Sequence, residues 1–258
     1  MSRGLVDIGA EGILLAGAGR AILLQIADPA VGHGVAEHSD FASRPLDRLR
    51  GTMSYVYAVV YGTDRQLATV RRAVNRAHAP VRRKAEGDVP GYSAFDVHAQ
   101  LWVAATLYDT AVTVYERIHG PLDEVSANRV YREYARIGTE LQVPAKLWPA
   151  DRSAFTEYWK ERLATLAPDD VARSVSRQLM HPDAGPPWLR AGMPLVRNLT
   201  AGLLPSSLRD GFGLEWSPRR FEWDMRVLAA VYPRLPRAVR HWPKNHYLAL
   251  LEGADARA

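Results

Sequence analysis

The chain has 258 residues, of which 47% are hydrophobic and 24% are charged, and its formal net charge is +5 at pH 7. These proportions are typical of a globular chain and exclude intrinsic disorder and the low-complexity and collagen-like classes. Cysteine is absent, which excludes disulfides, cysteine-ligated zinc or iron–sulfur sites and thiol nucleophiles. No Gly/Ser-rich linker divides the chain, so a single domain over residues 1–258 is expected.

Neither an export signal nor a membrane span is evident in the sequence. The first residues lack a basic region followed by an unbroken apolar stretch. The longest apolar runs, around residues 21–27, 55–61 and 101–108, are far shorter than the ~20 residues that cross a bilayer. We therefore expect a cytoplasmic protein with no transmembrane segment.

Apolar residues recur at helical spacing along the whole chain, whereas alternating strand patterns are scarce. This pattern predicts an all-α fold, with about nine to ten helices around a long central apolar helix. The segment 31–45, rich in Gly, His, Ser and Asp, is predicted to be an ordered loop. The predicted helices cover residues 13–26, 46–61, 64–84, 93 or 95 to 118, 126–141, 152–166, 169–180, 193–204, 218–231, and 236 or 241 to 251.

His78 lies on the apolar stripe of the helix predicted over residues 64–84, so its imidazole is expected to face the core. Arg71 and Arg82, at offsets of −7 and +4, would flank it on the same helix. A haem needs an imidazole in an apolar pocket for its iron and cationic groups for its propionates. The alternative is a core histidine that is hydrogen-bonded to a backbone carbonyl.

Two other groups of residues are candidates for a site. Arg48 and Thr52 are four residues apart, so they share a helix face and could hold a propionate or a polar substrate group. They could equally be an ordinary helix-start arginine and a helical threonine. A cluster of titratable and polar residues on the predicted loop is either a functional site or a solvated turn. Its members are His33, Glu37, His38, Ser39 and Asp40.

The long central helix contains polar residues that could be buried. His98, Trp102 and Asp109 can share one of its faces, and a buried Asp109 would need a partner, for which an arginine is expected. Glu116 and His119 form the Glu-x-x-His pair of this helix, whereas a carboxylate-bridged di-iron centre needs two such pairs. We interpret these two residues as a surface glutamate and a histidine that interacts with the helix C-terminus.

Longer strings of residues resemble a known family. They include DP at 28–29, VAEHSDF at 35–41, PLDRLRGT at 45–52, YGT at 61–63, RAHAPVR at 76–82, PGYSA at 90–94, LWVAATL at 101–107, GPL at 120–122, and LLP at 203–205. In this order, and over nearly the whole chain, they resemble the catalytic domain of the rubber oxygenase (latex-clearing protein) and mpaB-type oxygenase family.

The resemblance implies an all-helical domain that binds haem b non-covalently, with His78 as the proximal iron ligand. It matches Arg48 and Thr52 to a face that is important in rubber-cleaving members, and Glu37 to a glutamate thought to act there as a base. A haem in this position would also be contacted by Arg71, Arg82 and Trp102. The lysine that precedes the threonine in rubber-cleaving members is replaced by Gly51. This departure implies either an open or water-filled distal site, or a homologue whose haem chemistry differs or has been lost, so that haem is absent.

The function expected on this basis is a haem b-dependent oxygenase. It would use dioxygen and an unidentified reductant to cleave or oxygenate an apolar, alkene-containing small molecule inside the cell, and it would have no nucleic-acid partner. The first alternative is a haem-binding protein without turnover. An all-α nucleic-acid-binding regulator is suggested by the pI of about 9.5 and the arginine runs at 71–72 and 82–83. A protein of membrane surfaces is suggested by Trp188, Trp216, Trp223 and Trp242.

Overall fold

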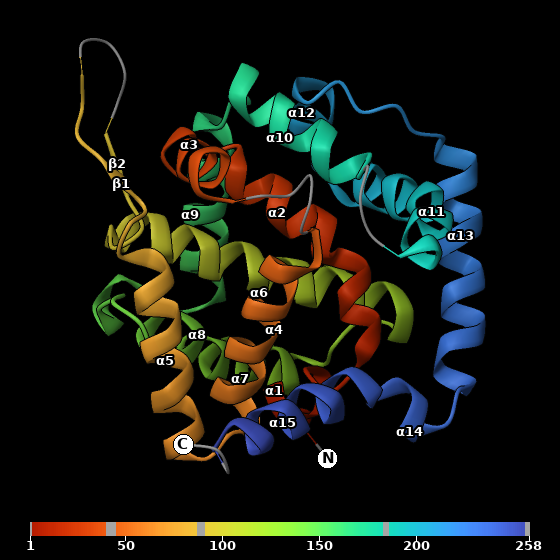
Figure 1. Cartoon of the computed structure of the whole chain (residues 1–258). Helices are drawn as coiled ribbons and strands as arrows, with labels where there is room; N and C mark the ends of the chain where they lie inside the picture. Colours follow the sequence, from red (N-terminus) through yellow and green to blue (C-terminus); the bar gives the residue numbers. More distant parts are fainter. Residues whose placement is uncertain (1, 40–44, 87–90, 183–185, 256–258) are drawn as a thin grey trace.

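The computed structural model of the chain describes residues 2–39, 45–86, 91–182 and 186–255 (Figure 1). These residues form an all-α protein apart from one short antiparallel ribbon, in which β1 (Arg82–Arg83) pairs with β2 (Tyr92–Ser93). The ribbon projects from the helices at the upper left of Figure 1. The fold class predicted from the helical spacing of apolar residues is therefore confirmed.

The first half of the chain forms α1 (Leu5–Ile8), the 3₁₀ helix η1 (Gly12–Gly17), α2 (Ala18–Ile26), α3 (Pro29–His38), α4 (Pro45–Tyr61), α5 (Asp64–His78) and α6 (Val97–His119). The second half forms α7 (Glu124–Tyr134), α8 (Arg136–Thr139), η2 (Ala145–Leu147), α9 (Arg152–Thr165), α10 (Asp170–Met180), α11 (Pro187–Leu203), α12 (Ser206–Gly211), α13 (Pro218–Val231), η3 (Tyr232–Arg234), α14 (Arg237–Arg240) and α15 (Trp242–Asp255).

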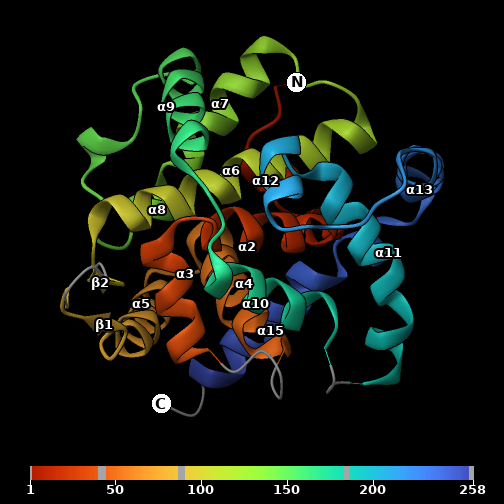
Figure 2. The ribbon, with the colours of Figure 1, turned by 90° about the horizontal axis from the view of Figure 1, so that it is seen from above.

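The long apolar helix predicted at the centre is α6. It is buried on several sides, with Leu101, Trp102, Ala105 and Val114 all less than 5% exposed. Seen from above, α7 and α9 lie on one side of α6, and α2, α3 and α10 lie on the other (Figure 2). Packing on both sides explains why this helix is apolar nearly all round.

The predicted loop 31–45 is wrong over its first part, because α3 occupies residues 29–38. Asp28 caps this helix, accepting hydrogen bonds from the backbone N–H groups of Ala30 and Val31, and Pro29 occupies its first turn. A Cβ on Gly32 would lie 2.6 Å from the carbonyl oxygen of Ile26. This glycine therefore permits a close approach of two helices and does not mark a loop. Residues 40–44 of the predicted loop lie outside the described residues.

The helix predicted over residues 64–84 ends at His78. Pro80 has no backbone N–H and cannot continue the helix, and the chain then enters β1. The N-terminus of the helix follows the prediction, because Thr63 and Gln66 form a capping box there. The early end changes the direction of every residue after 78, including Arg82.

The other differences concern breaks and short helices. The helix predicted over 13–26 begins with the 3₁₀ turn η1, the one over 126–141 is split into α7 and α8, and α11 begins earlier than predicted and contains Pro194. The short helices α1, α8, α12 and α14 raise the helix number in the described residues above the nine or ten expected. Helices this short have too few residues for a periodic pattern to show.

In the described part of the chain, no single helix has both the length and the apolar composition for crossing a membrane. One pair, residues 12–26 with residues 29–38, passes the same test jointly and is bent by 110° between its two parts.

Candidate functional site

A cavity of about 520 Å³ lies among α2, α4, α6, α10 and α11 and is lined mainly by apolar side chains. This volume is within the range of small-molecule sites, which are mostly apolar with a few placed polar groups. The apolar lining comes from several helices, and its members include Leu14, Ile22, Leu49, Met53, Val56, Val60, Leu107, Ala111, Leu179, Met193, Val196, Leu199 and Leu228.

Arg48 and Thr52 on α4 both line this cavity, as expected for residues four apart on one helix. The Arg48 guanidinium donates a hydrogen bond to the Ser39 hydroxyl at 3.2 Å. Burial lowers the pKa of Arg48 to about 10, so this side chain is still a cation at neutral pH. The cavity wall therefore carries a positive charge and a hydroxyl group among mainly apolar side chains.

His78 is the last residue of α5 and is half-buried. Its Nδ1 atom is buried and has no hydrogen-bond partner among the described residues, and its ring packs edge-on against Phe95 with centroids 6.2 Å apart. Burial, and then the charge of Arg48, lower the pKa of His78 below its ordinary value of 6.5. The imidazole is therefore neutral at pH 7, with a free lone pair on one ring nitrogen.

Arg48 is the residue that connects His78 with the cavity. His78 is not among the described residues that line the cavity, but it is close enough to Arg48 for the guanidinium charge to act on it. Of the residues singled out in the sequence, the structure thus places Arg48 and Thr52 on the cavity wall and His78 within reach of the Arg48 charge.

Arg71, Arg82 and Trp102 lie elsewhere. Arg71 is exposed and forms an ion pair with Glu140 at 3.5 Å, and Arg82 is exposed on the β1 strand. Trp102 is completely buried, and its Nε1 donates to the backbone carbonyl of Leu24 at 3.0 Å. None of the three is among the described residues that line the cavity.

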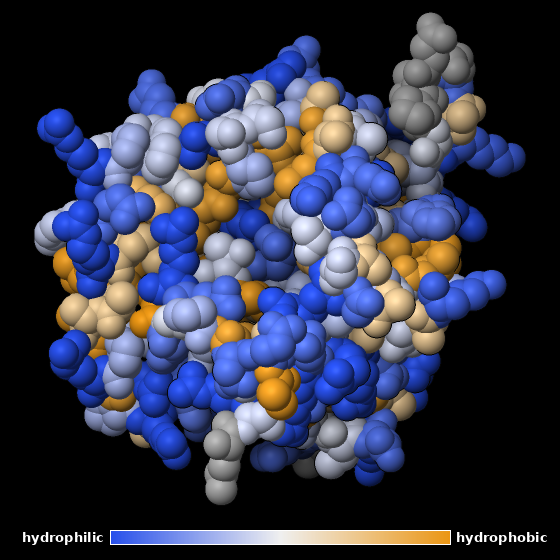
Figure 3. Space-filling view, turned by 180° about the vertical axis from the view of Figure 1, so that it is seen from behind, coloured by the Kyte–Doolittle hydropathy of each residue, from blue (hydrophilic) through white to orange (hydrophobic). Residues whose placement is uncertain are grey.

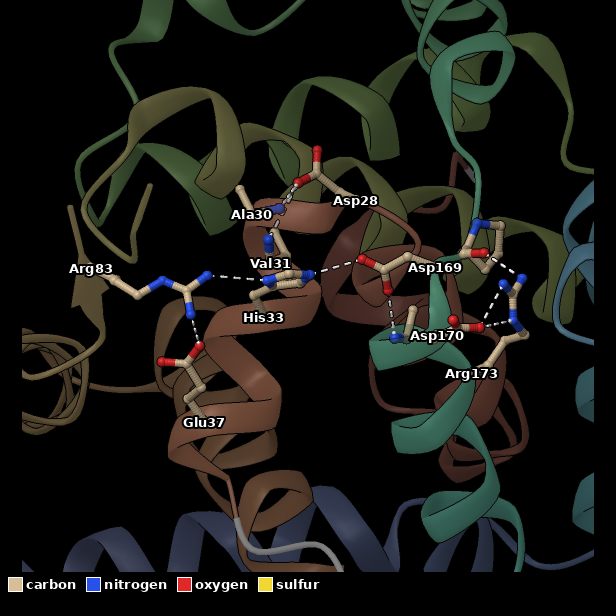
Figure 4. Close-up of polar contacts among 11 residues, drawn as sticks. Asp28, Ala30, Val31, His33, Glu37, Arg83, Asp169, Asp170 and Arg173 are labelled. Carbon is tan, nitrogen blue, oxygen red and sulfur yellow. Dashed lines mark hydrogen bonds and ion pairs between the residues drawn. The ribbon is translucent and has the colours of Figure 1, made fainter. Parts of the chain in front are cut away.

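Glu37 belongs to a separate polar network that joins α3 to the ribbon (Figure 4). Its carboxylate forms an ion pair with Arg83 and accepts a hydrogen bond from the Tyr92 hydroxyl at 2.5 Å. Arg83 also contacts His33 Nδ1 at 3.2 Å, and His33 Nε2 contacts Asp169, the N-cap of α10, at 2.8 Å. Because Arg83 can only donate, Nδ1 of His33 accepts and Nε2 carries the hydrogen that Asp169 accepts.

The polar residues predicted on the central helix lie outside the cavity. The expectation that Asp109 pairs with an arginine is confirmed, because Arg20 on α2 lies 2.5 Å from its carboxylate. His98 is exposed. His119 lies in the last turn of α6, as expected; it is largely buried and stacks on Tyr115 with ring centroids 4.7 Å apart.

Sequence reasoning missed several polar residues of the cavity, among them Gln25 and Thr110. Gln25 on α2 lines it, and its side-chain amide donates to the Thr106 hydroxyl at 3.1 Å. Thr106 in turn donates to the carbonyl of Val103 at 2.7 Å, so the position of the Gln25 side chain is fixed. Gln25 stands within the apolar run 21–27, and periodicity alone gives no sign that a glutamine there faces a cavity.

Comparisons with known proteins agree with the resemblance. The family model described as "ER-bound oxygenase mpaB/B'/Rubber oxygenase, catalytic domain" matches residues 7–234. Two uncharacterised proteins, from Mycobacterium bovis and Mycobacterium tuberculosis, are each 41% identical to the chain over 216 residues, covering 80% of this chain and 84% of theirs. No solved structure matches. The match spans most of the chain, including α4 and α6, which line the cavity, and α5, which carries His78, and the chain therefore belongs to the mpaB and rubber oxygenase catalytic-domain family.

Proposed function

We propose that this protein is a haem b-dependent oxygenase that oxygenates or cleaves an apolar, alkene-containing small molecule bound in the cavity. The family membership supports an oxygenase. The observation that carries the finer proposal is the position of Arg48, which lines the apolar cavity and is close enough to His78 for its charge to lower the pKa of that imidazole. One side chain thus connects a substrate-sized cavity with a ligand suited to iron.

His78 and Arg48 have the side-chain chemistry that a haem needs. Iron needs a neutral imidazole, and the buried Nδ1 atom of His78 has no competing hydrogen-bond partner in the described part of the chain. A propionate needs a cationic donor, and Arg48 is a partly desolvated guanidinium in the neighbourhood. Haem b would supply a redox-active iron that reacts with dioxygen.

The chain's own residues would then bind the haem and orient the substrate. His78 would hold the iron, and Arg48 and Thr52 would hold a carboxylate or another polar group at the α4 wall. The apolar lining would exclude water from the substrate, and the Gln25 amide, fixed by Thr106, would orient a polar end of the substrate.

Glu37 has no part in this proposal. One oxygen of its carboxylate pairs with Arg83 and the other accepts from the Tyr92 hydroxyl, so both oxygens are engaged by residues of the ribbon. It also lies outside the described lining of the cavity.

The test is an absorption spectrum with a pyridine haemochrome assay on protein produced with a haem precursor. The wild-type protein is expected to contain about one haem per chain, and the His78→Ala variant to lose it. His98→Ala is the matched control, because His98 is exposed on the neighbouring helix α6. Haem retained by His78→Ala but lost from His98→Ala would contradict the assignment of the ligand.

Turnover is tested separately by oxygen uptake with a reductant and geranylgeraniol, an apolar chain rich in alkene groups. The proposal expects uptake that depends on the alkene and falls at least tenfold in His78→Ala. Haem-loaded protein that consumes no oxygen with geranylgeraniol or a sterol alkene would instead support haem binding without turnover.

A further inference from the structure

The C-terminal part of the chain exposes large apolar side chains that the proposed site does not use. Trp223, Val231, Val239 and Trp242 are each more than half exposed, and Val227 is 38% exposed. We call these five residues, with the helices α13 and α14 and the start of α15 that bear them, the C-terminal flank. It runs down the right edge of the molecule in Figure 1.

The apolar residues of α13 form a stripe on its outer side. Trp223, Val227 and Val231 are spaced four apart, so they follow one face of the helix. Phe221 and Met225 on the opposite side are buried. In Figure 3, apolar patches alternate with hydrophilic side chains on the left of the view, where α13 lies. An amphipathic helix normally hides its apolar stripe, whereas α13 also presents one to the outside.

The same segment is strongly basic. Residues 217–244 contain six arginines and one lysine against Glu222 and Asp224, so their formal charge equals the +5 of the whole chain. Arg219, Arg226 and Arg237 are exposed and have no ion-pair partner among the described residues. Arg219 lies four residues before Trp223 and Arg226 three after it, which places both beside the apolar stripe.

We propose that the C-terminal flank docks onto an anionic lipid surface. Tryptophan and aliphatic side chains that insert at the interface, together with arginines that reach lipid phosphates, are the combination that holds amphipathic helices on membranes. Charge argues against a second copy of the chain as the occupant, because two such flanks would bring their arginines together. Nucleic acid would attract the arginines but would leave Val227, Val231 and Val239 in water.

The flank lies directly against the cavity wall. Leu228, on the inner side of α13, lines the cavity, and so does Leu195 on the adjacent helix α11, which is also 38% exposed. If the proposed oxygenase function is correct, an apolar substrate dissolved in a bilayer would be separated from the cavity by this pair of helices. The docking itself does not depend on that function.

The test is flotation of the full chain with two kinds of vesicle, one of phosphatidylcholine alone and one of phosphatidylcholine mixed with phosphatidylserine. The wild type is expected to float with the mixed vesicles and to be released by high salt. Each basic side chain near an anionic surface strengthens binding about five-fold, so Arg219→Gln/Arg226→Gln/Arg237→Gln should weaken partitioning roughly 100-fold. Trp223→Ser/Val227→Ser/Val231→Ser should also abolish flotation.

Two control variants replace the same types of exposed side chain outside the C-terminal flank. Arg76→Gln/Arg132→Gln/Arg177→Gln neutralises exposed arginines on α5, α7 and α10, and Val6→Ser/Val125→Ser removes exposed valines. Both controls should float like the wild type. All the substituted residues are exposed, so unchanged thermal unfolding should show that every variant folds.

Three results would overturn the proposal: wild-type protein that stays unbound, flank variants that float like the controls, or a dimer in solution that only the Trp223 variant disrupts. Salt-dependent binding to duplex DNA that exceeds vesicle binding would identify nucleic acid as the partner instead. Flotation requires neither haem nor turnover. A protein that does not bind vesicles could therefore still be an oxygenase, and a protein without haem could still bind vesicles.

Discussion

Arg20 and Asp109 form an ion pair across the interface of α2 and α6, with 2.5 Å between the guanidinium nitrogen and the carboxylate oxygen. The Arg20 side chain is only 5% exposed and also donates to the backbone carbonyl of Leu203 and to the Thr110 hydroxyl. A buried cation with three acceptors from two helices fixes how α2, α6 and α11 are placed around the cavity.

Removing Asp109 should destabilise the protein markedly. Asp109→Ala leaves the buried Arg20 without a compensating charge, and we expect a loss of about 2–3 kcal/mol in the free energy of unfolding. Urea denaturation followed by circular dichroism measures this loss. The exposed pair of Glu157 and Lys160 gives the comparison, since Glu157→Ala should change stability by less than about 0.5 kcal/mol. Equal effects of the two substitutions would contradict this account.

Gly19 on α2 allows a close contact with α11. A Cβ at this position would overlap the Thr200 hydroxyl, which is itself fully buried. Gly19→Ala should therefore cost about 2 kcal/mol through overpacking. Gly192 in α11 is the control, because nothing lies within 4 Å of a Cβ built there. Gly192→Ala should stabilise the helix by roughly 0.5 kcal/mol. Thermal unfolding of the two variants should shift in opposite directions.

His119 should make the stability of the protein depend on pH. Burial lowers the pKa of His119 below 6.5, the charges of Arg240 and Arg3 lower it further, and Glu11 acts in the opposite direction. The unfolded chain therefore binds more protons between this lowered pKa and 6.5. The contribution of His119 is fully present above pH 6.5 and is lost as the pH falls through its folded-state pKa.

The substitution His119→Phe tests this pH dependence. A phenyl ring keeps the stacking on Tyr115 but cannot titrate. It also removes a buried Nε2 atom that lies 3.9 Å from the Glu11 carboxylate and has no hydrogen-bond partner among the described residues. Unfolding temperatures measured from about pH 7.5 down to about pH 5 should fall less steeply in the variant than in the wild type. Parallel curves would show that folding does not shift the pKa of His119.

Filling the cavity should block the binding of apolar ligands. Ala111 lies on α6 at the cavity wall and is almost fully buried. In Ala111→Phe the larger ring can occupy empty space, so we expect binding of the uncharged fluorophore N-phenyl-1-naphthylamine to weaken at least tenfold while the protein stays folded. Ala154→Phe on the exposed side of α9 is the control and should bind like the wild type. Unchanged affinity in Ala111→Phe would place the fluorophore elsewhere.

Local patterns predicted the elements that depend on local causes. The capping box at Thr63, the stop at Gly120 and the apolar residues of α6 can all be read within a few positions of the chain. The pair Arg48 and Thr52 was also predictable, because a spacing of four fixes a shared helix face. Arg82 was misplaced because its expected position assumed a helix that continued past Pro80.

The glycines and polar partners depended on distant contacts. Gly32 suggested a loop, yet it lies within α3. A glycine is needed there because the carbonyl oxygen of Ile26 leaves no room for a Cβ atom. Glu37 suggested a catalytic base, yet Arg83 and Tyr92 approach it from the ribbon, and Gln25 had no local sign of facing a cavity. None of these contacts produces a periodic pattern of residues in the sequence.

The sequence by itself determined the all-α class, the central helix and the family, because helical periodicity and short ordered strings of residues are local properties of the chain. Only the tertiary structure decided that Arg48 and Thr52 share a cavity with Gln25, that the charge of Arg48 acts on His78, and that Glu37 does not line this cavity. The reason is physical: a cavity is formed by side chains from helices far apart in the chain, and their packing, not their spacing, determines which of them meet.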